Sequence, residues 1–265
     1  MNHFKIFQNK KVFITGHTGF KGAWLTAWLQ KLGADVIGAS IDVVSEPSHF
    51  VSANLDKYIH DVRLDITNSE ELKNIVKEER PDFVFHLAAQ SLVRESYSNP
   101  VDTWNTNLIG TLNVLESLRD IDHKCVAVII TSDKCYDNVE WVWGYKETDA
   151  MGGPDPYSAS KGAAELLIKS HVRSFFSDNG SVRIASARAG NVIGGGDWAK
   201  DRIVPDCVKA WSKDKVVKLR NPNATRPWQH VLEPLSGYLR LACALHESNK
   251  LHGESFNFGP PSKQN

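Results

Sequence analysis

A glycine-rich turn near the N-terminus constrains the fold more than any other feature of the sequence. Residues 15–22 read Thr-Gly-His-Thr-Gly-Phe-Lys-Gly and join an apolar run, Val12–Thr15, to Gly22–Leu32, where apolar residues recur at helical spacing. Glycine permits positive φ and lets a ligand approach the main chain closely. Such a turn between strand and helix is typical of sites that bind dinucleotide phosphates at a helix N-terminus. The alternative is a tight turn whose glycines serve only packing.

Acidic residues after the next two predicted strands extend this interpretation. Asp42 follows the run Asp35–Ile41, where a carboxylate can accept hydrogen bonds from the adenosine ribose and would repel a 2′-phosphate. The sequence therefore favours NAD over NADP, with a solvated loop aspartate as the alternative. Asp65 and Ile66 are candidates for contact with the adenine edge, and a turn aspartate remains equally open. The candidate contacts in the glycine-rich turn are Gly16, Thr18, Gly19, Phe20 and Gly22.

Short apolar runs alternate with helical stretches over residues 1–190. Strands that alternate with helices indicate βαβ units, so we predict an α/β fold with a doubly wound parallel (Rossmann) sheet. The expected strands are Val12–Thr15, Asp35–Ile41, Val62–Ile66, Phe83–Ala88, Val126–Thr131, Arg183–Arg188 and Ser255–Phe258. The expected helices are Gly22–Leu32, Ser69–Glu79, Trp104–Leu118, Ser158–Phe176 and Pro234–His246.

The pattern changes after Gly190, where glycines and prolines interrupt the chain. We therefore expect residues 1–190 to form an NAD-binding domain. Residues 191–265 are expected to form a smaller, loop-rich substrate lobe, some of whose elements return to the first domain.

Charge and cysteine content exclude several classes of protein. Lys+Arg and Asp+Glu both number 31, so the formal net charge is zero, and neither a nucleic-acid footprint nor a polybasic membrane anchor is indicated. The four cysteines form no CxxC pair and show no zinc spacing, and no metal site is expected. Isolated thiols, with no apolar run long enough for a signal peptide or a membrane span, favour a cytoplasmic protein.

Two short segments carry the candidate catalytic residues. Residues 157–161 read Tyr-Ser-Ala-Ser-Lys, and positions i and i+4 of a helix share a face, so Tyr157 and Lys161 can reach one site. A nearby ammonium and the nicotinamide charge would stabilise a phenolate that accepts a proton from a sugar hydroxyl. Ser132, Asp133 and Lys134 follow an apolar strand, at the end where ligands bind in doubly wound sheets. The alternatives are a surface helix pair and a capped turn.

Six stretches now make the chain resemble the extended short-chain dehydrogenase/reductase family, and within it the nucleotide-sugar 4,6-dehydratases that act on CDP-glucose. They are Thr15–Leu25, His86–Arg94, Thr131–Gly144, Gly152–Lys161, Ala189–Arg202 and Arg226–Leu235. The GxxGxxG and YxxxK motifs mark only the superfamily, whereas TSDKCYDN and GNVIGGGDW narrow the resemblance to the CDP-sugar branch.

The resemblance implies a reaction and roles for five residues. Tyr157, with Ser132 and Lys161, would remove the C4 hydroxyl proton of CDP-glucose while NAD⁺ takes the C4 hydride. Asp133 would protonate the leaving C6 hydroxyl, and the hydride would return to C6 to give CDP-4-keto-6-deoxyglucose. Lys134 would take the C5 proton, which requires a pKa lowered by burial or by neighbouring cations. Alternatively, Lys134 only positions a water or the substrate.

The resemblance also implies binding residues outside the catalytic segments. Leu87, Ala88 and Ala89 would contact NAD. Trp198 and Trp228 can stack on a base, although core packing is the favoured interpretation for both. The candidate substrate contacts are Gln90, Ser132, Asn191, Arg202, Arg220, Arg226 and His230, in which arginine suits phosphate oxygens. Each arginine taken singly is equally consistent with a solvated surface charge.

Two other functions and two structural questions stay open at this point. A nucleotide-sugar 4-epimerase or a GDP- or dTDP-sugar dehydratase would share the Tyr157–Lys161 pair, but an epimerase needs no elimination acid. A non-catalytic dinucleotide sensor would be expected to lack the tyrosine or the lysine. Family members continue beyond the position where this chain ends, so the substrate lobe is expected to be incomplete. Their helix pairs imply a homodimer or a higher homo-oligomer.

Overall fold

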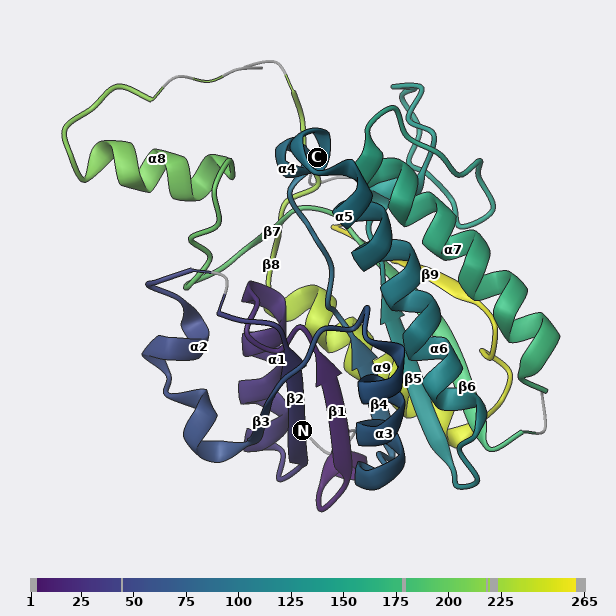
Figure 1. Cartoon of the computed structure of the whole chain (residues 1–265). Helices are drawn as coiled ribbons and strands as arrows, with labels where there is room; N and C mark the ends of the chain where they lie inside the picture. The colour runs from purple at the N-terminus through teal and green to yellow at the C-terminus, as the bar shows by residue number, and fades with distance from the viewer. Residues whose placement is uncertain (1–3, 44, 178–179, 218, 220–223, 261–265) are drawn as a thin grey trace.

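The structure is a computed structural model that describes residues 4–43, 45–177, 180–217, 219 and 224–260. It confirms the predicted α/β class (Figure 1). Seven strands pair in parallel in the order β3-β2-β1-β4-β5-β6-β9. Their bounds are β1 Lys11–Thr15, β2 Asp35–Ser40, β3 His60–Arg63, β4 Phe83–His86, β5 Cys125–Ile130, β6 Val182–Ala189 and β9 Ser255–Phe258.

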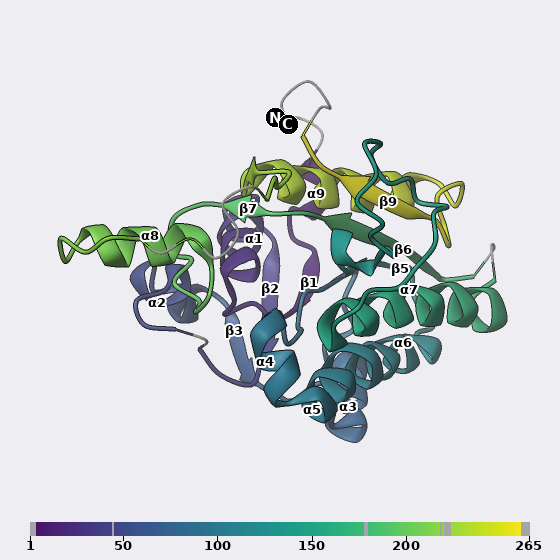
Figure 2. The same ribbon diagram turned by 90° about the horizontal axis from the view of Figure 1, so that it is seen from above.

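Helices cover both faces of the sheet, as Figure 2 shows. α1 (Phe20–Lys31) and α9 (Leu232–Glu247) bury apolar residues on one face, and α3 (Ser69–Glu79), α6 (Gly110–Arg119) and α7 (Pro156–Phe175) on the other. Every residue of β5 is buried, which explains its uninterrupted apolar sequence, since a strand covered on both faces has no solvent side. The strand ends between these two helical layers position the candidate site.

The helix predicted over Trp104–Leu118 is interrupted. The chain forms α4 (Val93–Ser98), α5 (Pro100–Trp104), a π-helical turn over Asn105–Ile109, and then α6. Asn107, inside the wide turn, donates to the Gln90 carbonyl at 3.0 Å and to Ser160 Oγ at 2.9 Å. These bonds to distant parts of the chain accompany the departure from α-helical spacing, and π turns are frequent at functional sites.

The third strand along the chain, β3, lies earlier in the sequence than predicted. The strand covers His60–Arg63 rather than Val62–Ile66, because Leu64 and Ile66 are buried with the helices on the second face instead of continuing the edge of the sheet. Two short helical segments precede the strand, α2 (His49–Ser52) and a 3₁₀ turn at Leu55–Tyr58, and neither was predicted.

The C-terminal part divides between the sheet and an outlying segment. β9 pairs with β6, and α9 supplies much of the core on the α1 face. α8 (Ile203–Trp211), which the sequence did not predict, lies away from the sheet in both views (Figures 1 and 2). Its Pro205 falls in the first turn, where a missing N–H costs no intrahelical bond. β7 (Val192–Ile193) and β8 (Gln229–His230) pair with each other.

Candidate active site

The predicted site residues follow the carboxyl ends of four neighbouring strands. The glycine-rich turn follows β1, residues 87–90 follow β4, residues 131–134 follow β5, and Asn191 follows β6. Because the strands are parallel, these segments meet at one edge of the sheet, where ligands bind in doubly wound folds. The structure thus brings the N-terminal turn and the central polar residues to one region.

Close packing around the turn leaves room for backbone only. Gly16 has φ 77°, and a Cβ there would lie 2.6 Å from the Ala88 nitrogen. A Cβ on Gly22 would lie 2.0 Å from the Gly16 carbonyl oxygen. α1 begins after Gly19 without a side-chain cap, so the N–H groups of its first turn are not taken by a capping side chain. This turn fits a dinucleotide pyrophosphate, which needs close backbone approach and a helix N-terminus.

The acidic candidates beside the turn differ in their contacts. Thr18 Oγ1 donates to the Asp42 carbonyl at 2.6 Å, which ties the end of β2 to the turn, and the Asp42 side chain is exposed. Asp65 accepts from the Thr67 N–H at 2.9 Å, so its carboxylate serves a local turn. Ile66 is buried against Gly110, the first residue of α6. The Asp42 carboxylate likewise accepts a local bond, from the Val43 N–H at 2.7 Å, so the two aspartates differ in the tie between the Asp42 carbonyl and the glycine-rich turn.

A buried histidine fixes the segment after β4. His86 Nδ1 hydrogen-bonds to Thr15 Oγ1 at 2.7 Å, and its Nε2 to Thr111 Oγ1 at 3.0 Å. Burial lowers the pKa of His86 to about 3, so the ring is neutral at physiological pH. The Leu87 N–H donates to the Thr15 carbonyl at 3.0 Å, which holds residues 87–89 against the glycine-rich turn.

The Gln90 amide is already engaged within its own loop. Its Nε2 donates to Thr103 Oγ1 at 2.9 Å and to the Leu92 carbonyl at 3.1 Å, and its Oε1 accepts from the Leu92 N–H at 2.6 Å. A substrate contact through this side chain would require one of these bonds to break. The substrate role of Gln90 stays a prediction.

Tyr157 and Lys161 lie on the first turns of α7, whose start the sequence indicated. Asp155 caps the helix by accepting from the Ser158 N–H at 2.9 Å, and Pro156 occupies the first helical position. Both side chains are buried, at 7% exposure for Tyr157 and 4% for Lys161. Burial raises the pKa of Tyr157 to about 12, against a hydrogen bond with Ser132 that lowers it.

Lys161 supplies a charge that is easily removed. Burial lowers its pKa to about 8, while Glu165 one turn later acts to raise it. The structure therefore holds a buried tyrosine, a serine within hydrogen-bonding reach and an ammonium close to its titration point. Together these groups can take a proton from a hydroxyl once a further positive charge lowers the tyrosine pKa.

Asp133 and Lys134 have opposite environments. Burial raises the pKa of Asp133, although the hydrogen bond from Ser132 Oγ to Oδ1 at 3.1 Å and the charges of Lys134 and Lys21 oppose the shift. A carboxyl group that keeps its proton longer can act as an acid. Lys134 is exposed, so the burial that a basic lysine requires is not provided by the protein itself.

A buried polar network, which the sequence did not reveal, lies behind Lys161. Glu165 is 3% exposed and accepts hydrogen bonds from the side chains of Thr131, Ser186, Arg188 and Ser255. Its bond with Arg188 is an ion pair of 2.7 Å. Arg188 also donates to the Tyr136 hydroxyl at 2.7 Å. The sequence signal that could have identified Glu165 is its i+4 spacing from Lys161, which places both residues on one side of the helix.

Lys21, between the second and third glycines of the turn, is a second residue that was missed. Its Nζ donates to the Tyr238 hydroxyl at 3.3 Å. Burial, with the charges of Lys161 and Arg202, lowers the pKa of Lys21 to about 8. The sequence signal that could have identified Lys21 is a charged residue in a segment that leads into a buried helix.

The substrate candidates are only partly assembled near these groups. Arg202 bonds to Asp197 at 2.7 Å and to Ser91 Oγ at 3.4 Å, and its charge lowers the pKa values of Tyr157 and Lys21, so it lies near the centre. Asn191 is half-buried, directly after β6.

The other substrate candidates are less well placed. Arg226 is exposed and donates to the Thr225 carbonyl, and the exposed His230 accepts from the Leu232 N–H at 3.3 Å. Lys209 lies over the Trp198 ring at 5.8 Å, and Trp228 is 38% exposed. Arg220 lies outside the described residues.

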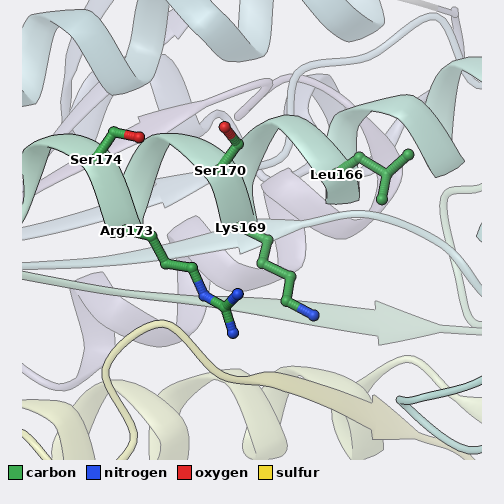
Figure 3. Close-up of a pocket in the computed structure, with 5 residues that line it drawn as sticks. All are labelled: Leu166, Lys169, Ser170, Arg173 and Ser174. Carbon is green, nitrogen blue, oxygen red and sulfur yellow. The ribbon is translucent and has the colours of Figure 1, made fainter.

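A shallow depression on the outer face of α7 is separate from this centre. Figure 3 shows Lys169 and Arg173 pointing to the same side from successive turns. The depression begins about two and a half turns beyond Tyr157, and none of the candidate catalytic residues lines it. Its lining residues are Leu166, Lys169, Ser170, Arg173 and Ser174.

Comparison with known proteins places this geometry in a family. Residues 13–252 match the family model described as GDP-mannose 4,6 dehydratase. The chain is 50% identical over 258 residues to CDP-glucose 4,6-dehydratase of Salmonella typhimurium, covering 96% of this chain and 72% of that protein. It is 26% identical to CDP-paratose 2-epimerase of Salmonella typhi, over 94% of this chain and 78% of that protein.

Solved structures agree on the fold. A dTDP-glucose 4,6-dehydratase from Streptomyces venezuelae, solved with NAD, superposes with a TM-score of 0.81 at 20% identity, over 94% of this chain and 75% of that one. An epimerase from Methanothermobacter thermautotrophicus gives a TM-score of 0.81 at 27% identity, over 98% of this chain and 74% of that one. None of the described helices is long and apolar enough to cross a membrane. The family model and the 50% identical relative together mean that the chain belongs to the nucleotide-sugar 4,6-dehydratases.

Proposed function

We propose that this chain converts CDP-glucose to CDP-4-keto-6-deoxyglucose with NAD as a tightly held cofactor. The observation that carries the proposal is the placement of Asp133 beside Ser132. Its carboxyl group has a raised pKa and directly follows a serine that hydrogen-bonds to Tyr157. An enzyme that only oxidised and reduced C4 would need no such acid. The identity with a CDP-glucose 4,6-dehydratase supports the choice of substrate.

The glycine-rich turn and the ends of β2 and β4 would hold the cofactor. Gly16, Gly19 and Gly22 leave the backbone open to the pyrophosphate, with Thr18 and Phe20 beside it, and the α1 N-terminus favours the negative charge. The backbone of residues 87–89 borders the same turn, and Asp42 is placed for the adenosine ribose. When bound, NAD⁺ accepts the C4 hydride and later supplies it to C6, so it is not consumed.

In the first half of the reaction, Tyr157 takes the proton of the C4 hydroxyl. Ser132, which hydrogen-bonds to Tyr157, orients the same hydroxyl. The pKa of Tyr157 is about 12 in the protein alone, so proton transfer relies on the charge of Lys161 and on the positive nicotinamide to stabilise the phenolate. The ketone formed at C4 then acidifies the neighbouring C5 proton.

In the second half, Asp133 gives its proton to the C6 hydroxyl, which leaves as water when the C6–O bond breaks. Lys134 takes the C5 proton as the base. Because Lys134 is exposed in the protein alone, this role depends on the substrate covering its ammonium group. A proton returns to C5 as the hydride reaches C6. The sugar therefore loses protons at O4 and C5 and receives protons at O6 and C5, and the balance closes.

We propose Arg202 and Asn191 as the main substrate contacts. Arg202 influences Tyr157 electrostatically, and its guanidinium can bind the diphosphate bidentately. Arg226 and His230 would contribute only after a local rearrangement, because each is exposed and bonded locally.

The assembly and location of the enzyme are also proposals. Leu166 on α7 is 59% exposed, and we propose that its face of α7, together with α6, forms the contact of a homodimer of a cytoplasmic enzyme. Analytical ultracentrifugation of the wild-type chain and a Leu166→Glu variant would test the contact, with a monomeric wild type as the contradicting result.

The decisive experiment is incubation with CDP-glucose and NAD⁺, followed by product identification by NMR and by the absorbance of keto sugars in alkali. UDP-, GDP- and dTDP-glucose form the comparison set. Tyr157→Phe is expected to lose about 10²-fold or more of the activity, since general bases contribute on that scale. Conversion of UDP-glucose to UDP-galactose without any keto sugar would establish an epimerase and overturn the proposal.

A further inference from the structure

Lys21 places a positive charge inside the protein on the α1 face of the sheet. It occupies the second position of α1, and its Nζ bonds to the hydroxyl of Tyr238 on α9 at 3.3 Å. The same ammonium lies 5.6 Å from the centre of the Tyr238 ring. Tyr238 is 0% exposed. Lys21 is half-buried, and removing a cation from water is costly unless it is compensated, so a compensating role at this position is expected.

Asp133 lies close to both members of this pair. The Asp133 charge acts on Lys21 and on Tyr238, raising the pKa of each group relative to burial alone. A Cβ on Gly190 would lie 3.0 Å from Asp133 Oδ2, while Oδ1 accepts from Ser132 Oγ. The carboxyl group is therefore enclosed on the side of β6 and held by Ser132, with Lys21 and Tyr238 on the α1–α9 side.

We infer that Lys21 is a positioning residue of the elimination step, whose ammonium stabilises the carboxylate that Asp133 becomes when it protonates the leaving C6 hydroxyl. The inference rests on the proposed function and extends it to a residue of the cofactor turn. In this step the proton moves from the Asp133 carboxyl to O6, the C6–O bond breaks, and a negative charge is left on Asp133. A nearby half-buried cation stabilises that charge more strongly than it would in bulk water.

The other cations near the centre are less suited to this task. Lys134 is exposed, so water weakens its effect on Asp133. Arg202 is paired with Asp197 at 2.7 Å, and Lys161 is coupled to Glu165. Lys21 forms no ion pair with a carboxylate in the described part of the chain, so its charge remains available to Asp133.

Several titratable groups would share in the pH dependence of Asp133. They come from the 3₁₀ turn Asp133–Cys135 after β5, from α7, from α1 and α9, and from the segment before α8. These groups are Lys134, Cys135, Tyr157, Lys161, Lys21, Tyr238 and Arg202. Lys21 can be removed without touching a group to which the reaction assigns a proton, and, unlike Arg202, it is not a proposed substrate contact.

Lys21→Met keeps most of the length of the side chain and removes its charge. We expect kcat to fall about tenfold or more, because one unit of pKa corresponds to a tenfold change in equilibrium, with less than about a twofold change in KM. In single turnovers followed at 340 nm, C4 oxidation should keep its rate while the reduced cofactor decays more slowly. Lys31→Met, at the exposed last position of the same helix, is the matched control and should match the wild type.

A pH profile separates this role from mere damage. In a plot of kcat against pH, the alkaline limb that reports deprotonation of Asp133 should disappear in Asp133→Asn. In Lys21→Met the same limb should move to higher pH, because loss of the cation raises the Asp133 pKa. An unmoved limb, or equal slowing of C4 oxidation and elimination, would overturn the inference. If Lys21→Met unfolds, as judged by circular dichroism, Lys21→Gln is used instead. A wild type that yields no keto sugar from any nucleotide-glucose would overturn the proposed function itself.

Discussion

Removal of the Glu165 side chain tests the buried network beside Lys161. Glu165→Ala would leave the Arg188 guanidinium, which is 3% exposed, without its carboxylate. The hydroxyl groups of Thr131, Ser186 and Ser255 would lose an acceptor in the same step. The result is an uncompensated charge and several unsatisfied donors inside the protein.

The structure sets the size of the expected effect. Removal of one partner of a buried ion pair costs about 3–5 kcal/mol, because the remaining charge keeps its full desolvation penalty. That is a large part of the roughly 5–15 kcal/mol that stabilises a typical native protein. For a chain of this length, about 2–4 °C of melting temperature corresponds to each kcal/mol. We therefore expect Glu165→Ala to lower the melting temperature by about 6–20 °C.

The assay is unfolding by heat and by urea at pH 7, each followed by far-ultraviolet circular dichroism, for the wild type and three variants. Glu165→Gln keeps the shape and several hydrogen bonds but not the charge, and should fall between the wild type and Glu165→Ala. Glu78→Ala, on the exposed face of α3, is the control and should change the free energy of unfolding by less than about 0.5 kcal/mol. A loss below about 1 kcal/mol for Glu165→Ala would refute the reasoning, because it would mean that water reaches Arg188.

Three further outcomes follow from the structure. Gly22→Ala should weaken NAD binding, measured by calorimetry, by tenfold or more, because its Cβ would lie 2.0 Å from a carbonyl of the turn, whereas Gly195→Ala, with no atom within 4 Å, should bind normally. Folded His86, with its pKa lowered to about 3, stays neutral while the unfolded state takes up a proton below pH 6.5. His86 should therefore contribute a loss of stability of about 2 kcal/mol between pH 7 and pH 5, and His86→Asn should lack this contribution in unfolding experiments, while His17, His49 and His246, whose pKa values are also lowered, keep theirs. Glu165→Gln removes the charge that raises the Lys161 pKa, so the alkaline loss of C4 oxidation should begin at lower pH, and an unchanged profile would contradict this coupling.

The sequence predicted the parts of the fold that repeat a local pattern. The glycine-rich turn, the buried strands and the helix that begins at Pro156 all carry their signals within a few neighbouring residues. Ser69–Glu79 and Ser255–Phe258 matched the predicted bounds. The interrupted helix around Asn107 did not, because its π turn accompanies bonds to Gln90 and Ser160 that no local pattern records.

The candidate site was predictable to the same extent. Tyr157 and Lys161 share a helix and a recognisable spacing, so the sequence alone singled them out. Lys21 meets Tyr238 across 217 positions of the chain, and no periodicity links residues so far apart. The exposure of Lys134 likewise depends on how the 3₁₀ turn after β5 is covered, which is a property of the packed structure.

The order of strands in the sheet has a consequence for the synthesis of the protein. β9 supplies Ser255, a partner of Glu165, yet it is translated after all six other strands of this sheet. A nascent chain folds its N-terminal part first, so the dinucleotide turn can form before Glu165 gains its bond with Ser255. The set of hydrogen bonds around Glu165 is complete only when β9 pairs with β6. A ribosome-bound chain should therefore gain cofactor affinity before it gains turnover.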